Sequence, residues 1–156
     1  MSEEKITIVF HPDDRTTYTY ILPDVVKMSD NENMSRDLKE QAGKYLWFSS
    51  LCARLAAKRD NISNHLKELQ ASKEMFYRRQ AEVNGDKTTE AKIKAMVDAD
   101  AEVNKVKSFL SDAEGELSIC YSIRDAFSQR KDMLVALGAN WRAELNAYNP
   151  DNLRGN

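Results

Sequence analysis

The sequence predicts a mainly α-helical protein built on a long antiparallel helical hairpin, coiled-coil-like, with a short β-hairpin at its N-terminus. Two stretches carry an apolar residue at every seventh position, and an Asn-Gly turn at residues 83–86 separates them. A seven-residue repeat keeps a narrow apolar seam facing a partner helix. The first line comprises Phe48, Leu55, Ile62, Leu69 and Phe76, and the second comprises Val106, Ala113, Cys120, Phe127, Leu134 and Trp141.

Residues 1–28 predict a β-hairpin followed by a linker. The runs 6–10 and 17–22 are rich in β-branched and aromatic residues, and the segment 11–15 connects them. This pattern is typical of paired strands, and Pro23 ends the second one. Because an isolated two-stranded sheet is only marginally stable in water, we expect it to pack on the helices or to pair with a neighbouring subunit.

The helical hairpin is expected over residues 29–148, with a flexible tail at 149–156. A capping-box pattern at 29–32 starts the first helix, Ser35 is a second candidate start, and the helix runs to about residue 82. Gly85 suits the left-handed residue that ends a helix, and Thr88 or Thr89 suits the cap of the next one. We expect a break at 98–100, a helix from there to about residue 138, and a short terminal helix to residue 148.

Helices of this length need partners. Each arm would run roughly 75 to 90 Å at about 1.5 Å per residue, too long to bury itself in one compact globule. The simplest partners are further copies of the chain. The helix is apolar nearly all round at residues 45–48, which places it at a subunit interface or under the β-hairpin. The expected interface residues are Tyr45, Leu46, Trp47, Phe48, Phe127, Leu134 and Trp141.

Several functional classes lack their sequence signals. Neither of the two histidines, His11 and His65, has a Cys or carboxylate near it at the spacing that metal ligands require. The sequence also has no phosphate-binding loop, so we expect no enzymatic activity, metal or cofactor. The acids at positions 98, 100 and 102 are explained by helix capping. No apolar run is long enough to span a bilayer and no signal peptide opens the sequence. Cys52 and Cys120 fall on apolar helical lines, so we expect buried free thiols and a cytoplasmic setting.

The charge distribution points to the turn. Residues 54–94 carry ten Lys and Arg against six Asp and Glu, whereas residues 95–116 carry two against six. Cations beside aromatic rings are what sequence-tolerant binding of single-stranded nucleic acid requires. A solvated helix face has a similar composition, so spacing alone leaves both readings open. The candidate DNA-binding residues are Lys73, Tyr77, Arg78, Arg79, Lys87, Lys92 and Lys94, with Phe76 among them.

The order of these features resembles a known family. Tyr45-Leu-Trp47 is followed by a basic helix into Arg78-Arg79, the Asn-Gly turn, and the segments 89–100, 102–106 and 126–134. Over roughly residues 24–145 this order is similar to that of the UvsY-like recombination mediators of tailed bacteriophages. The paired strands at the N-terminus and the slightly acidic net charge of −2 depart from the family pattern.

The resemblance implies a helical homo-oligomer, a ring of six or seven subunits, acting in the host cytoplasm during phage recombination and repair. Such mediators bind single-stranded DNA and help a RecA-like recombinase to displace single-strand-binding protein. It also implies that paired basic residues before the turn contact the strand. Arg78 and Arg79 occupy that place, although they are adjacent where the family's pair is separated by one residue.

Two other hypotheses remain open at this point. A β-hairpin joined to long helices is also typical of coiled-coil scaffolds and prefoldin-like chaperones, which bind protein rather than DNA. A component of a phage virion is the third. The N-terminal β-hairpin has three conceivable roles, namely binding DNA, joining subunits and docking a partner protein.

Overall fold

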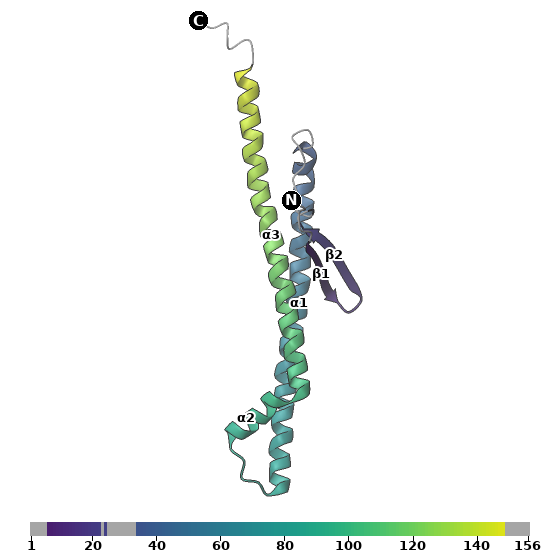
Figure 1. Ribbon diagram of the computed structural model, residues 1–156, viewed down its shortest axis with the longest axis vertical. Helices are drawn as coiled ribbons and strands as arrows, with labels where there is room; N and C mark the ends of the chain where they lie inside the picture. The colour runs from purple at the N-terminus through teal and green to yellow at the C-terminus, as the bar shows by residue number, and fades with distance from the viewer. Residues whose placement is uncertain (1–5, 23, 25–33, 149–156) are drawn as a thin grey trace. The chain divides into compact units, whose positions relative to one another are not determined.

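The computed structural model describes residues 6–22, 24 and 34–148, and it is mainly helical with a two-stranded antiparallel sheet near the N-terminus (Figure 1). The elements are β1 (Ile6–Asp13), β2 (Thr16–Leu22), α1 (Met34–Asn84), α2 (Glu90–Ala99) and α3 (Ala101–Ala147). The helical class and the N-terminal β-hairpin are therefore confirmed. The expected helix start at 29–32, the strand end at Pro23 and the tail at 149–156 lie outside the described residues.

The chain divides into two compact units. Of the described residues, the first comprises 6–9, 19–22, 24, 34–51 and 120–148, and the second comprises 10–18 and 52–119. Each unit contains part of α1 packed against part of α3. In both units, residues later in α3 contact residues earlier in α1. The two helices therefore run antiparallel, as the sequence predicts.

The first unit has an aromatic and apolar core. The ring of Phe48 on α1 stacks on that of Phe127 on α3, with centroids 5.3 Å apart, and contacts Tyr20 of β2 at 5.2 Å. Trp47 Nε1 donates a hydrogen bond of 2.7 Å to the Tyr20 hydroxyl, so β2 packs on α1 within this unit. Aromatic pairs of this kind add roughly 0.5–1.5 kcal/mol to the burial of their area.

A polar cluster is buried in the same unit. Asp37 and Gln41 on α1 and Arg130 on α3 are all buried. Arg130 Nη1 donates to Gln41 Oε1 at 2.7 Å and Nη2 lies 3.1 Å from Asp37 Oδ1, while Gln41 Nε2 donates to the carbonyl of Phe127. Buried charges are tolerated when they are paired and hydrogen-bonded, and the two terminal nitrogens of Arg130 are engaged in this way.

In the second unit, the tip-proximal halves of the helices and the turn end of the β-hairpin share a core. Its fully buried side chains include Phe10 of β1, Leu55 of α1 and Val103 of α3. Lys58 Nζ donates to the His11 carbonyl at 2.7 Å, and Arg54 Nη2 lies 2.6 Å from Asp13 Oδ2. Two basic side chains of α1 therefore hold β1 in place.

Only part of each heptad line is buried. Leu55 on α1 and Ala113, Cys120 and Leu134 on α3 are buried, whereas the last member of each line, Phe76 and Trp141, is exposed. Both cysteines are free and buried, as expected. Within each unit the seam joins α1 and α3 of one chain, and the last member of each line leaves a large apolar side chain at the surface.

Two predicted boundaries are wrong. The connector expected at 11–15 is only a turn at Asp14 and Arg15, because β1 continues through His11 and Pro12. The His11 backbone N–H donates to the Glu116 side chain, and its carbonyl accepts from that of Lys58. The helix expected to end near Gly138 continues to Ala147. One glycine costs a helix only about 1 kcal/mol, and the surrounding Ala, Leu and Arg residues are good helix formers.

Candidate nucleic-acid interface

The hairpin tip, which we define as residues 73–102, is built by three local signals. Helix α1 ends in a Schellman motif, in which Asp86 N–H donates to the Ala81 carbonyl at 3.0 Å and Gly85 N–H donates to that of Glu82 at 3.2 Å. Gly85 has a φ of 71°, the left-handed conformation that glycine adopts at little cost. Thr89 caps α2 by accepting a hydrogen bond from the N–H of Lys92 at 3.3 Å. The predicted turn and cap are confirmed.

Asp100 makes the break between α2 and α3. Its Oδ1 accepts hydrogen bonds from the backbone N–H groups of Glu102 at 2.9 Å and Val103 at 3.3 Å, so it caps α3. Its Oδ2 accepts from the Tyr77 hydroxyl at 2.8 Å and lies 3.1 Å from Lys73 Nζ. The same carboxylate therefore starts one helix and ties it to α1. The break expected at 98–100 is confirmed.

The contacts of Asp100 shift the proton affinities of this cluster. The Tyr77 hydroxyl bond, together with Lys73 and the two backbone donors, lowers the pKa of Asp100 from 3.8 to about 2. Hydrogen bonds to Glu102 and Asp100 raise the pKa of Lys73. The bond to Asp100, helped by burial, raises the pKa of the Tyr77 hydroxyl. Asp100 is thus held as a carboxylate and Lys73 as an ammonium.

The structure sorts the seven candidate DNA-binding residues into two groups. Lys73 lies 2.8 Å from Glu102 Oε2 as well as near Asp100, and Tyr77 donates to Asp100. Arg78 Nη2 lies 2.6 Å from Glu90 Oε2, an ion pair that links α1 to α2. These three side chains are already engaged within the tip, so their charge and hydroxyl are largely satisfied by the protein.

The other four candidates are exposed cations. Arg79 and Lys87 have no acidic partner among the described residues, and Lys92 donates to Thr89 through its backbone N–H. Lys94 lies close enough to Asp98 for its charge to help lower the pKa of that carboxyl, which is set mainly by Lys107. We call Arg79, Lys87, Lys92 and Lys94 the tip cations.

The tip also carries an exposed aromatic ring, one helical turn before Arg79 on α1. Phe76 is 58% exposed, although it packs edge-on against Tyr77 with centroids 5.4 Å apart. A large aromatic ring that is more than half exposed offers a face on which a nucleobase can stack.

The residues expected at an oligomer interface also fall into two groups. Phe48, Phe127 and Leu134 are buried within the chain itself, so they stabilise the helical hairpin and present no surface to another copy. The other four are between 42% and 67% exposed, namely Tyr45, Leu46, Trp47 and Trp141. A seven-residue repeat fixes which side chains face a helix, but it does not fix which chain supplies that helix.

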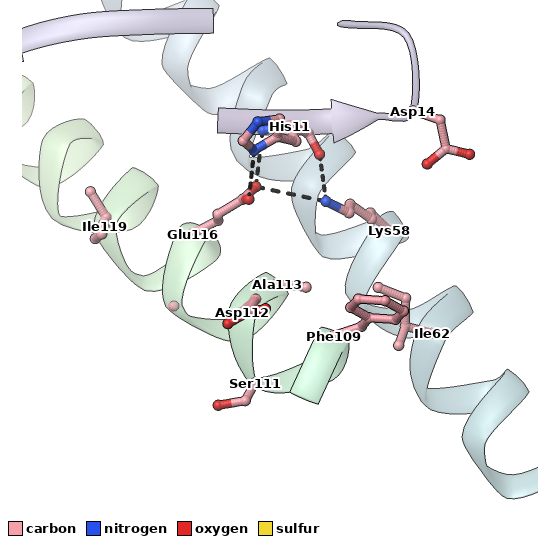
Figure 2. Close-up of a pocket in the computed structure, with 11 residues that line it drawn as sticks. His11, Asp14, Lys58, Ile62, Phe109, Ser111, Asp112, Ala113, Glu116 and Ile119 are labelled. Carbon is pink, nitrogen blue, oxygen red and sulfur yellow. Dashed lines mark hydrogen bonds and ion pairs between the residues drawn. The ribbon is translucent and has the colours of Figure 1, made fainter. Parts of the chain in front are cut away.

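Sequence reasoning missed a groove in the second unit (Figure 2). His11 N–H donates to Glu116 Oε2 and its Nδ1 lies 3.0 Å from Glu116 Oε1, while Lys58 Nζ lies 3.8 Å from Glu116 Oε2. Beside this cluster is a hollow of about 830 Å3, whose floor and walls include Ile62 and Phe109. The excess of acidic residues over 95–116 was the available signal in the sequence. Nothing in the sequence, however, shows that β1 packs against this acidic segment.

Across residues 6–22, 24 and 34–148, no three His, Cys, Asp or Glu side chains are grouped so as to hold a metal ion. Within the same residues, no helix is both long and apolar enough to cross a membrane. Comparison with family models, with curated proteins and with solved structures found no match.

Proposed function

We propose that this protein is a single-stranded-DNA-binding recombination mediator that works as a homo-oligomer and helps to load a RecA-like recombinase onto DNA. The observation that supports it is the composition of the hairpin tip. Arg79 and Lys87 are exposed without an acidic partner among the described residues, and the exposed ring of Phe76 belongs to the same tip. The exposed cations can neutralise phosphates of the strand, and the exposed ring can stack with an unpaired base.

The fold of the tip favours a small binding patch repeated many times. The Schellman turn and the Asp100 cluster fix the ends of α1, α2 and α3, so the tip cations are carried on a defined scaffold. One tip offers few charges and binds weakly by itself. Joining several tips in one assembly raises the overall affinity through a high effective concentration, without any new contact.

The oligomer itself belongs to the proposal. Tyr45, Leu46 and Trp141 are large apolar side chains left at the surface of the first unit, and under this proposal they are where copies of the chain meet. A ring of six or seven copies, as the resemblance to UvsY-like mediators implies, would set the tips at regular spacing along one strand. Single-strand-binding protein would be displaced as the recombinase enters, in the cytoplasm of the phage-infected bacterium.

Binding of a labelled oligonucleotide at several salt concentrations tests the proposal. Each phosphate neutralised on a single strand contributes about 0.7 to the slope of log affinity against log salt. Replacing Arg79 or Lys87 by Ala should lower that slope by about this amount. Arg78→Ala should lower it less, because Glu90 already holds that guanidinium.

Lys131→Ala is the matched control, since this exposed cation lies on α3 outside the tip and should leave the slope unchanged. Absence of binding at low salt would contradict the proposal and favour a protein-binding scaffold or chaperone instead. Recombinase loading is measured separately, as the rate at which a RecA-like ATPase becomes active on strands coated with single-strand-binding protein.

A further inference from the structure

The groove in the second unit has walls from three elements (Figure 2). Helix α3 contributes Phe109, Asp112, Glu116 and Ile119, α1 contributes Ile62, and β1 contributes His11. The four α3 residues are spaced three or four positions apart, so they share one face of that helix. Phe109 is 51% exposed and Ile119 is 43% exposed. The face therefore has apolar residues at both ends and two acids between them.

The two acids differ in how they are satisfied. Glu116 is engaged by His11 and Lys58, whereas Asp112 has no ion-pair partner among the described residues. Asp14, at the turn of the β-hairpin, adds a further exposed acid at the rim. An occupant of this groove must therefore combine apolar side chains with a cation.

The chain carries such a surface itself. Phe76, Arg79 and Val83 follow one another at spacings of three and four along α1 and so share a face, which we call the α1 terminal face. Phe76 is 58% exposed and Val83 is 81% exposed, and Arg79 between them has no acidic partner among the described residues. Its order, apolar then cation then apolar, matches the order along the α3 wall of the groove.

We propose that the groove binds the α1 terminal face of a second copy, with Arg79 of that copy facing Asp112. The apolar residues at each end would then be covered while the opposite charges meet. Because the groove and the face are different surfaces, the contact is head-to-tail and can propagate from copy to copy. This differs from a contact through Tyr45, Leu46 and Trp141, which lie in the first unit.

The contact is small and therefore weak. Specific stable interfaces bury about 1,200–2,000 Å2, and a few side chains on each side give less than that. A weak contact can be displaced. Arg79 is also a tip cation, so a DNA strand and the groove of a second copy would compete for it. The competition depends on the proposed function, whereas the docking itself does not.

Charge exchange tests the docking. Sedimentation velocity over a range of concentrations measures self-association of the full chain at low salt. Asp112→Lys and Arg79→Glu should each weaken the head-to-tail association by about tenfold, as expected when a close opposite-charge pair becomes a like-charge pair. The double variant Arg79→Glu/Asp112→Lys should restore it to within about threefold of the unaltered chain.

Glu114→Lys is the matched control. It makes the same charge change two residues away on α3, at an exposed acid that does not line the groove. It should leave self-association unchanged. An equal loss in this control, or a double variant no better than the singles, would overturn the proposal, because net charge rather than a specific pair would then explain the effect.

The competition has its own readout. Saturating oligonucleotide should dissociate the head-to-tail contact of the unaltered chain. Undiminished self-association in an excess of bound oligonucleotide would overturn the competition. Failure to bind oligonucleotide at all would count against the proposed function alone, since the charge-exchange result would still report on the docking.

Discussion

Replacing Arg130 by Ala should remove a large part of the stability of the first unit. Arg130 and Asp37 are both 4% exposed at the side chain, and Nη2 of Arg130 lies 3.1 Å from Asp37 Oδ1. Removing one member of such a pair leaves a buried charge without its counter-ion, which costs about 3–5 kcal/mol. In a chain of 156 residues this corresponds to a fall in Tm of about 6 to 20 °C.

Urea unfolding followed by circular dichroism, at one fixed protein concentration, measures the change. The fixed concentration matters because association of copies would add to the apparent stability. The exposed neighbour Lys131 provides the control, since Lys131→Ala should change the free energy of unfolding by no more than about 0.5 kcal/mol.

Replacing the whole buried polar cluster by apolar residues separates its effect on stability from its effect on the register of α1 against α3. The variant Asp37→Leu/Gln41→Met/Arg130→Met removes all three polar side chains together, so no charge is left unpaired, and its stability should lie near or above that of the unaltered chain. Our hypothesis is that the cluster fixes the register of α1 against α3. A loss below about 1 kcal/mol in Arg130→Ala would refute the burial argument, because an exposed ion pair contributes at most about that much.

Three further outcomes are expected. The folded-state pKa of Asp100 is about 2 against an ordinary 3.8, so its contribution to stability is present above pH 3.8 and is lost as the pH falls toward 2; Asp100→Asn should flatten the acid limb of a pH titration of unfolding. Gly85→Ala should destabilise by about 1 kcal/mol in urea unfolding, because φ at this position is 71°. Phe127→Ala should cost about 3–5 kcal/mol in the same assay, since the ring is completely buried, and a cost under 1 kcal/mol would contradict that packing.

The elements could be predicted because their signals are local. Gly85, Thr89 and Asp100 act on backbone groups within a few positions of themselves, and each does what its residue type predicts. The β-branched and aromatic runs likewise predict the β-hairpin. The helix end predicted at Gly138 is wrong because the helix formers on both sides of this glycine outweigh its cost of about 1 kcal/mol.

The candidate site could be predicted only in part because ion pairs join distant residues. Lys73 meets Asp100 and Glu102 across the turn, and Arg78 meets Glu90, so two of the positive charges that make the tip look basic are matched by acids. A sequence gives the number of charges in a segment but not which of them face one another. The count of ten basic residues against six acidic ones over 54–94 therefore overstates the charge available to a ligand.

Under the proposed function, the residues of the tip that hold no other element in place are the ones that bind DNA. Lys73 and Tyr77 hold Asp100, and Asp100 holds the start of α3, so altering either residue would disturb the tip before it removed a phosphate contact. Arg79 has neither duty, and it stands on the α1 terminal face with Phe76. An exposed cation and an exposed ring on one helix face can bind either a strand of DNA or the acidic groove of a second copy. Both proposals therefore depend on Arg79.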